Sequence, residues 1–325
     1  MIMNGAKTAP RCTESGFTLI ELMIALVLFA LVVAGMLQVA ATMAAGFNEQ
    51  QQTVTAEGSV RGAMEYVSEA LRGVSPGVPV ANIQHVNTCA TGALSVTNRN
   101  NAPDDFTAVF ASGSVTSTRT VYTTGTTSIT VTDASQLAIG DTVLVTNLDQ
   151  GHLAKISTVN AGTGVIGLAA QTCASLALPT GGYAPGSLVL RATRATFSVG
   201  TVDSMPTLML DPDAEGPALA EPFAEGVEDL QIALGIDANA DGSLTELGAA
   251  ANDDEWSFNS AGETQLAGSL RAVRVTFVAR TSGKRSTDVY LRPAAEDRPV
   301  ATAPDGYRRR TLTSMIEVRN LGGSP

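Results

Sequence analysis

Hydrophobic residues are concentrated near the start of the chain, in one run that is long enough to cross a bilayer. Between Phe17 and Gly46 the residues are mostly Leu, Val, Ile, Met, Ala and Phe, without proline, and Glu21 is the single charged residue. A helix of about 20 apolar residues spans the hydrocarbon core of a membrane. The pattern therefore predicts a membrane-length helix over residues 17–47, and a carboxylate inside such a helix indicates a function because it is costly.

The pattern then becomes amphipathic, over residues 48–75. Apolar residues recur there at spacings of three and four: Val60, Met64, Val67 and Leu71. This spacing places them on one face of a helix, while charged residues occupy the other faces. We therefore expect one long helix whose first part is surrounded by lipid and whose second part packs on a globular domain.

The remaining residues, 76–325, predict a β-rich head. Short segments rich in Val, Ile, Thr and Leu are separated by Gly, Asp, Asn and Pro, which is typical of strands and turns. The expected strands cover residues 106–111, 128–132, 141–146, 154–159, 165–169, 187–199, 207–210, 227–236, 270–279, 287–291 and 311–319. The expected fold class is therefore α+β, a long N-terminal helix packed on a β-rich globular head.

A short motif, Gly-Phe-Thr-Leu-Ile-Glu-Leu over residues 16–22, joins the apolar run to a polar leader, residues 1–16. This motif closely resembles the processing site of type IV prepilins. In that family prepilin peptidase cuts after the glycine, the new N-terminal phenylalanine is methylated, and the glutamate pairs with the terminal amine of a neighbouring subunit. The resemblance implies a cut between Gly16 and Phe17 and an assembly role for Glu21.

Two other interpretations of the N-terminus stay open, an ordinary secretory signal peptide cleaved near residues 40–45 and an uncleaved transmembrane anchor. The apolar run is longer than an ordinary signal sequence and carries Glu21 near its start, which disfavours the first. Lys7 and Arg11 place the N-terminal end in the cytoplasm by the positive-inside rule. We therefore expect a single pass through the inner membrane with a periplasmic head.

Several head segments resemble the PilW family of minor pilins, in the order in which that family has them. They are residues 139–145, residues 226–232 with the following acidic loop 235–242, and residues 307–320. The resemblance implies a structural, non-enzymatic minor pilin that moves from the inner membrane into a pilus, with prepilin peptidase and other minor and major pilins as partners. The alternatives are a type II secretion pseudopilin and a pilus-tip adhesin or calcium-dependent binding module.

Composition and cysteine use agree with an exported head. The formal charge is −11, which argues against binding to nucleic acid because that needs clustered Lys and Arg. Cys89 and Cys173 are an even pair outside the leader, so we expect a disulfide in an oxidising compartment. The alternative is two separate buried thiols.

The acidic loop is the one plausible metal site in the sequence. Asp237, Asn239 and Asp241 alternate and are followed by Gly242 and Ser243, which copies the first half of a calcium-binding loop. The closing acid is missing at the twelfth position, although an acid within residues 253–255 could complete a different calcium site. The alternative is a turn whose side chains cap their own backbone.

Other candidate residues carry no catalytic pattern. His85 and His152 have no nucleophile or metal ligand at a recognised spacing, and both lie among polar turn residues, so we expect them to be exposed. Residues 162–167 match a dinucleotide fingerprint in letters but lack the helix that it needs. We interpret the basic run Arg308–Arg310 as a solvated strand end, and the alternative is a contact with an acidic neighbouring subunit.

Overall fold

The computed structural model describes most of the chain, as one helix and fourteen strands. The described residues are 16–74, 78, 82–85, 91–123, 125–170, 181–214, 219–237, 243–245, 255–258, 270–284 and 290–318, with only the backbone of residues 111–114. The chain divides into two compact units, Met1–Gln51 and Gln52–Pro325. The α+β prediction is confirmed.

The helix α1 (Leu19–Arg72) contains both the apolar and the amphipathic parts of the pattern. In the first unit its large apolar side chains are exposed, for example Leu19 at 77% and Phe29 at 67%. By length and composition it is long and apolar enough to cross a membrane, with a mean hydropathy of 2.7 in its most apolar window.

In the second unit one face of α1 is buried in the head. The predicted stripe of Val60, Met64, Val67 and Leu71 is confirmed, since each of these side chains is at most 6% exposed. The helix stops after Arg72, where Val74 leaves it to form an isolated bridge with Phe110 of the sheet. The amphipathic part is thus held on both its apolar face and its C-terminal end.

Ten strands form the larger sheet of the head. They are β1 (Ile83–His85), β2 (Leu94–Thr97), β3 (Asp105–Ser117), β4 (Ser128–Thr130), β5 (Thr142–Thr146), β6 (Gly151–Asn160), β7 (Val165–Leu168), β8 (Leu188–Val202), β9 (Met205–Asp211) and β10 (Glu221–Glu225). The main order is β10-β9-β8-β5-β6-β7-β4, and β3 joins it at β8 and carries β2. The pairing of β1 with β6 is parallel.

Four strands form the second sheet, in the order β12-β11-β13-β14. They are β11 (Val227–Ile236), β12 (Trp256–Ser257), β13 (Leu270–Arg280) and β14 (Arg309–Glu317). Ten of the eleven expected strand segments overlap described strands. The expectation for 287–291 was wrong in its described part, because Tyr290 and Leu291 lie outside any strand.

Gly226 makes the turn that starts β11. Its φ is +83°, and an added Cβ would lie 3.2 Å from the carbonyl oxygen of Arg280. Its own amide bonds the Pro206 carbonyl, and its carbonyl accepts a bond from the Arg280 amide. A side chain is therefore disfavoured both by the left-handed backbone and by the close strand, which explains the glycine that opens the 226–232 segment.

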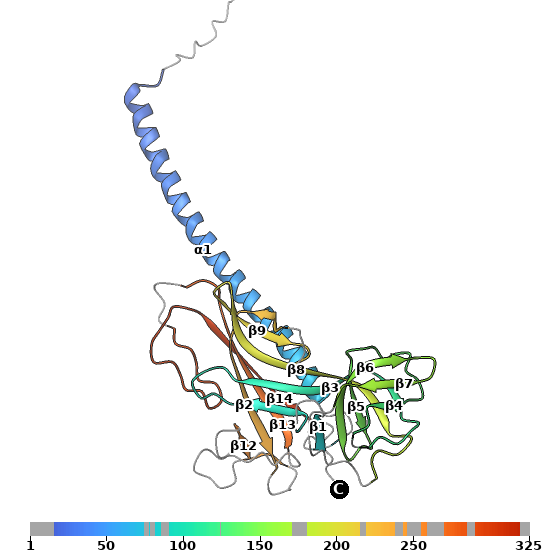
Figure 1. Ribbon diagram of the computed structural model, residues 1–325. Helices are drawn as coiled ribbons and strands as arrows, with labels where there is room; N and C mark the ends of the chain where they lie inside the picture. The colour runs from blue at the N-terminus through green and yellow to red at the C-terminus, as the bar shows by residue number, and fades with distance from the viewer. Residues whose placement is uncertain are drawn as a thin grey trace, which may run out of the picture. The chain divides into compact units, whose positions relative to one another are not determined.

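The head contains two separate hydrophobic cores. The first joins the amphipathic part of α1 to both sheets. The second lies among β4 to β7 and includes Tyr122, Ile129, Val143, Ile166 and Tyr183. In Figure 1 these four strands gather to one side of the head, apart from β12, β13 and β14. The second core closes a lobe of its own on the edge of the larger sheet.

Candidate functional site

The predicted processing site lies just before the start of α1. Gly16 and Phe17 are non-helical and exposed, Phe17 at 88%, and the helix begins at Leu19. The Thr18 amide donates a hydrogen bond of 3.0 Å to a carboxylate oxygen of Glu21, and the Glu21 amide donates one of 3.3 Å to the Thr18 hydroxyl. This reciprocal pair is a capping box, which satisfies two amides that the first turn leaves without partners.

The capping box is a role for Glu21 that the sequence analysis missed. Its signal, Thr-x-x-Glu before an apolar run, was present in residues 18–21. The carboxylate also accepts a bond of 2.9 Å from the Thr18 hydroxyl. In a single copy of the chain Glu21 is therefore already hydrogen-bonded, while the cut after Gly16 and the pairing with a neighbouring subunit stay predictions.

The predicted calcium loop lies mostly outside the described residues, as do Asn239, Asp241 and both Cys89 and Cys173. The described Ser243 is exposed. The Asp237 carboxylate is fully buried and accepts a hydrogen bond of 3.1 Å from Arg271. Within the described ranges no group of three or more His, Cys, Asp or Glu side chains could hold a metal ion. Calcium binding and the disulfide stay predictions.

The expectation that both histidines are exposed was wrong. His85 is 4% exposed and His152 is 0% exposed. His85 lies 2.9 Å from the Gly92 carbonyl oxygen, and burial lowers its pKa. The ring of His152 lies edge-on to Tyr122 and Tyr183, at 6.1 and 5.3 Å between ring centres, and burial lowers its pKa to about 4. His152 is buried because it lies in β6, which pairs with β5, β7 and β1. The turn-like residues around it in the sequence do not indicate these pairings.

The four-stranded sheet has an apolar face and a polar face, and both are covered. Along β11 the side chains of Leu230, Ile232, Leu234 and Ile236 belong to the first core. Alternate residues of a strand point to opposite faces. The opposite face carries polar side chains, of which Asp229, Gln231 and Thr276 are buried, Arg274 is half-buried and Thr313 is exposed. We call them the polar face.

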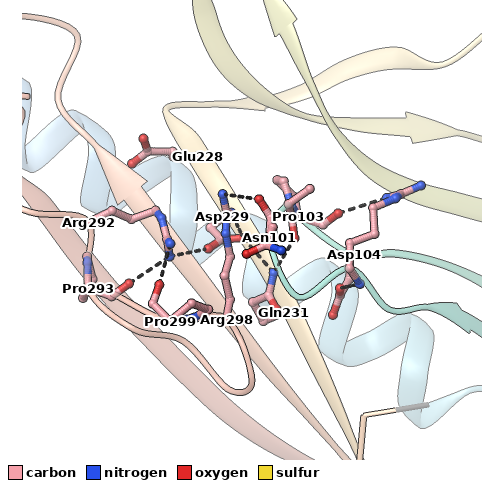
Figure 2. A network of polar contacts seen from close by, with 12 residues as sticks. Asn101, Pro103, Asp104, Glu228, Asp229, Gln231, Arg292, Pro293, Arg298 and Pro299 are labelled. Carbon is pink, nitrogen blue, oxygen red and sulfur yellow. Dashed lines mark hydrogen bonds and ion pairs between the residues drawn. The ribbon is translucent and has the colours of Figure 1, made fainter. Parts of the chain in front are cut away.

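On the polar face, Asp229 lies within the network of polar contacts that Figure 2 shows, together with Gln231, Arg292 and Arg298. Its buried carboxylate lies 2.6 Å from Arg298 and 3.3 Å from Arg292, and the Gln231 amide donates it a hydrogen bond of 3.0 Å. Both arginines belong to residues 290–308, which we call the covering segment. Two guanidinium groups on one fully buried carboxylate fix this segment on β11, because neither charge could be buried alone.

Asp104 fastens a second loop to the same strand. Its carboxylate accepts hydrogen bonds from the backbone amides of Arg99, at 2.8 Å, and Ile232, at 2.9 Å. Burial raises its pKa to about 7 in spite of these two bonds, and the carboxylates of Asp297 and Asp229 raise it further. Near neutral pH this side chain is therefore divided between its charged and its protonated form.

The covering segment has a second anchor at Glu296, which adopts a left-handed φ of 47°. Its carboxylate accepts a bond of 2.7 Å from the guanidinium of Arg274 and one of 2.7 Å from the Thr276 hydroxyl. A left-handed backbone at a residue other than glycine persists where surrounding contacts hold it. These bonds to β13 are such contacts.

The basic run at the start of β14 is only in part a solvated strand end, because the side chain of Arg310 is 64% exposed but that of Arg309 only 4%. Its guanidinium bonds Glu228, at 2.5 and 2.9 Å, and Asp305. Burial lowers the pKa of Arg309, but the hydrogen bonds to Asp305 and Glu228 outweigh this effect and raise it overall. For Arg309 the interpretation was wrong, because a run of like charges does not reveal a carboxylate that lies 81 residues away on β11.

Glu228, Asp229 and Gln231 all lie in the 226–232 segment, and their described contacts are all within the head. They bond β14, the covering segment and the loop before β3. The segment thus holds three other parts of the chain against one strand. These ion pairs and hydrogen bonds hold the surface of the head in place, so we interpret them as structural contacts.

Comparison with known proteins gives two family matches. Residues 11–37 match the prokaryotic N-terminal methylation motif, and residues 196–320 match the type IV pilus-assembly protein W family, PilW. The second match includes the whole polar face. No curated protein matches the sequence. A type IV-like pilin from Thermus thermophilus is similar at 10% identity, over 82% of this chain and 97% of that one, with a TM-score of 0.35.

Proposed function

Because this chain is a type IV pilin-like protein of the PilW family, we propose that it acts as a minor pilin where a type IV pilus begins to assemble. Prepilin peptidase would first cut it between Gly16 and Phe17. The apolar part of α1 would then pass from the inner membrane into the filament core, together with the helices of other pilins. The head would remain on the periplasmic side and later on the filament surface.

One observation carries this proposal, the exposed apolar surface of α1 that begins at a capped first turn. Most large apolar side chains over residues 19–47 are more than half exposed, including Leu26, Leu31, Leu37 and Met43. A continuous apolar surface of this kind needs lipid or other apolar helices as its partner. The described residues of the first hydrophobic core all lie in the second unit, from Ala56 onward, so these side chains are not part of it. The proposed transfer from lipid to filament gives it both partners in turn.

Three variants separate the charge of Glu21 from its capping role. Glu21→Gln keeps a side chain that can complete a capping box but removes the negative charge. Thr18→Ala removes the capping hydroxyl and keeps the charge, and Glu21→Ala removes both. If the carboxylate neutralises the Phe17 ammonium of a neighbouring subunit, Glu21→Gln and Glu21→Ala should both be absent from sheared filaments, while Thr18→Ala is present.

The measurement is quantification of the protein in membrane and filament fractions, with mass spectrometry of the N-terminal peptide. All three variants should still begin at N-methylated Phe17 in the membrane fraction, which verifies processing. Normal incorporation of Glu21→Gln together with loss of Thr18→Ala would assign Glu21 to helix capping alone. A chain that begins elsewhere than Phe17 would contradict the proposed processing.

A further inference from the structure

A pocket of about 280 Å³ lies in the second unit, beside the amphipathic part of α1 and the ends of β13 and β14. The helix contributes Thr53 and Ala56. The strand ends and the covering segment contribute the remaining polar lining, which is rich in guanidinium groups: Arg280, Thr281, Tyr290, Arg308, Arg309 and Arg310. Four arginines around one pocket are unexpected in a chain with a formal charge of −11.

The antiparallel pairing of β13 with β14 produces this concentration of charge. β13 ends at Arg280 and β14 begins at Arg309, and these two arginines are direct partners across the sheet. Like charges directly opposite each other destabilise a strand pair. Lys284 adds a further cation, 5.1 Å from the ring of Tyr307, which also stacks against Arg280 at 4.0 Å. The Glu228 carboxylate offsets this repulsion, because it lies 3.9 Å from Arg280 and is bonded to Arg309. The described lining of the pocket itself still has four guanidinium groups and no carboxylate, which favours an anion.

Not all of this charge is engaged equally. Arg309 is buried against Glu228 and Asp305 and forms the fixed wall of the pocket. Arg310 has a side chain 64% exposed and makes a 3.0 Å ion pair with Glu57, which is itself 37% exposed. An exposed ion pair contributes little and can open readily. Arg310 can therefore turn toward a ligand in the pocket without disturbing the core.

The position of the pocket in the chain indicates where its ligand would come from. Thr53 follows Phe47, the end of the apolar part of α1, by only six residues. Six residues span at most about 22 Å even when fully extended. Whatever the arrangement of the two units, the pocket therefore stays close to the surface of the membrane that holds the helix. Guanidinium groups bind phosphate oxygens with paired, charge-assisted hydrogen bonds.

We propose that this pocket binds the phosphate of an anionic phospholipid headgroup in the membrane that holds α1. This proposal rests on the proposed membrane insertion of α1. The lipid would be bound before the subunit is assembled into the filament. The bound headgroup would keep the head against the membrane until the subunit leaves it. Arg308 and Arg310 would bind the phosphate, and the wall formed by Arg309 would stay paired within the head.

The test uses the full-length chain in detergent, with native mass spectrometry of bound lipid. Phosphatidylglycerol and phosphatidylcholine are titrated separately, and inorganic phosphate is titrated in a third series. We expect phosphatidylglycerol to be retained at lower concentration than phosphatidylcholine. Arg310→Gln should weaken this retention about fivefold, and the double variant Arg308→Gln/Arg310→Gln should weaken it more than tenfold.

Arg119→Gln is the matched control, since Arg119 is also exposed but lies outside the pocket, and it should retain phosphatidylglycerol unchanged. Thermal unfolding of each variant verifies that the head is folded. Equal retention in the double variant would overturn the proposal and favour an acidic segment of a neighbouring subunit as the occupant. Competition by inorganic phosphate without any preference for the lipid would overturn the lipid as source. Neither result depends on filament incorporation, so the proposed function is tested separately.

Discussion

The two regions of the head bury polar side chains in opposite ways. On the polar face, Asp229 is charged, fully buried and placed between Arg292 and Arg298. In the second core, His152 is equally buried, but neither ring nitrogen has a hydrogen-bond partner among the described residues, and its neighbours are Tyr122 and Tyr183. The first region keeps its charge by pairing it, whereas the second keeps its ring neutral. Their stabilities should therefore respond differently to mutation and to pH.

The largest expected effect is at Asp229. Asp229→Asn keeps the shape of the side chain but leaves two buried guanidinium groups without their carboxylate. We expect the free energy of unfolding to fall by about 3–5 kcal/mol. Denaturant unfolding of the full chain in detergent measures this, with the fluorescence of the single tryptophan, Trp256, as a probe close to β11.

The control for this comparison is Glu225→Gln, an exposed carboxylate just before β11. Its effect should stay within about 0.5 kcal/mol, as for most surface substitutions. If Asp229→Asn cost no more than this control, the covering segment would be held by other contacts. The contrast between the two regions would then be lost.

The next effect is the pH dependence that Asp104 contributes. Its folded-state pKa of about 7 is above the usual carboxyl value, so the folded chain binds the proton more tightly than the unfolded chain. The free energy of unfolding should therefore rise by about 2–3 kcal/mol as the pH falls from 7.5 to 5. The difference between the wild-type profile and that of Asp104→Asn isolates this contribution, and parallel profiles would contradict it.

His152 should contribute a pH dependence of the opposite sign, and a somewhat smaller one, to the free energy of unfolding. Its pKa of about 4 is below the usual imidazole value, so its contribution is complete above pH 6.5 and is lost as the pH falls toward 4. His152→Phe, which suits a site between two tyrosine rings, removes a group that must otherwise stay neutral. Relative to its effect at pH 8, the variant should gain about 2 kcal/mol of stability at pH 5.

This is measured by unfolding His152→Phe and the wild type at pH 8 and at pH 5. An equal difference between them at pH 8 and pH 5 would mean that the histidine is not kept neutral by burial. Together with the Asp104→Asn profile, these curves would show whether Asp104 and His152 change the free energy of unfolding in opposite directions as the pH falls.

The parts of the fold that depend on local spacing could be predicted from the sequence. The apolar run, the stripe at Val60, Met64, Val67 and Leu71, and the strand β11 all follow from periodicities of 3.6 and 2. The Thr18 and Glu21 capping box was equally local and was missed only because the resemblance to prepilins had already given Glu21 another role.

The covering segment could not be predicted in the same way. Arg292, Glu296 and Arg298 are charged residues in a turn-rich stretch, and nothing near them in sequence indicates that β11 and β13 bury them. The one local hint was the polar group Glu228, Asp229 and Gln231 at the start of a strand that is apolar from there on. Buried ion pairs are set by residues distant in sequence, so the position of the partner is decided by the tertiary fold. For the same reason His152 and Arg309 were expected to be exposed.

The place of β14 in the fold has a consequence for how the protein is made. α1 leaves the ribosome early and can enter the membrane while the rest is being synthesised, yet β14 is needed to complete the four-stranded sheet. Ile316 and Val318 share the first core with Val60 and Val67, about 250 residues earlier. Such distant contacts form late and slowly. The core that covers the apolar stripe of the helix is therefore complete only after the last strand is in place, and until then part of that core is open to a chaperone or a protease.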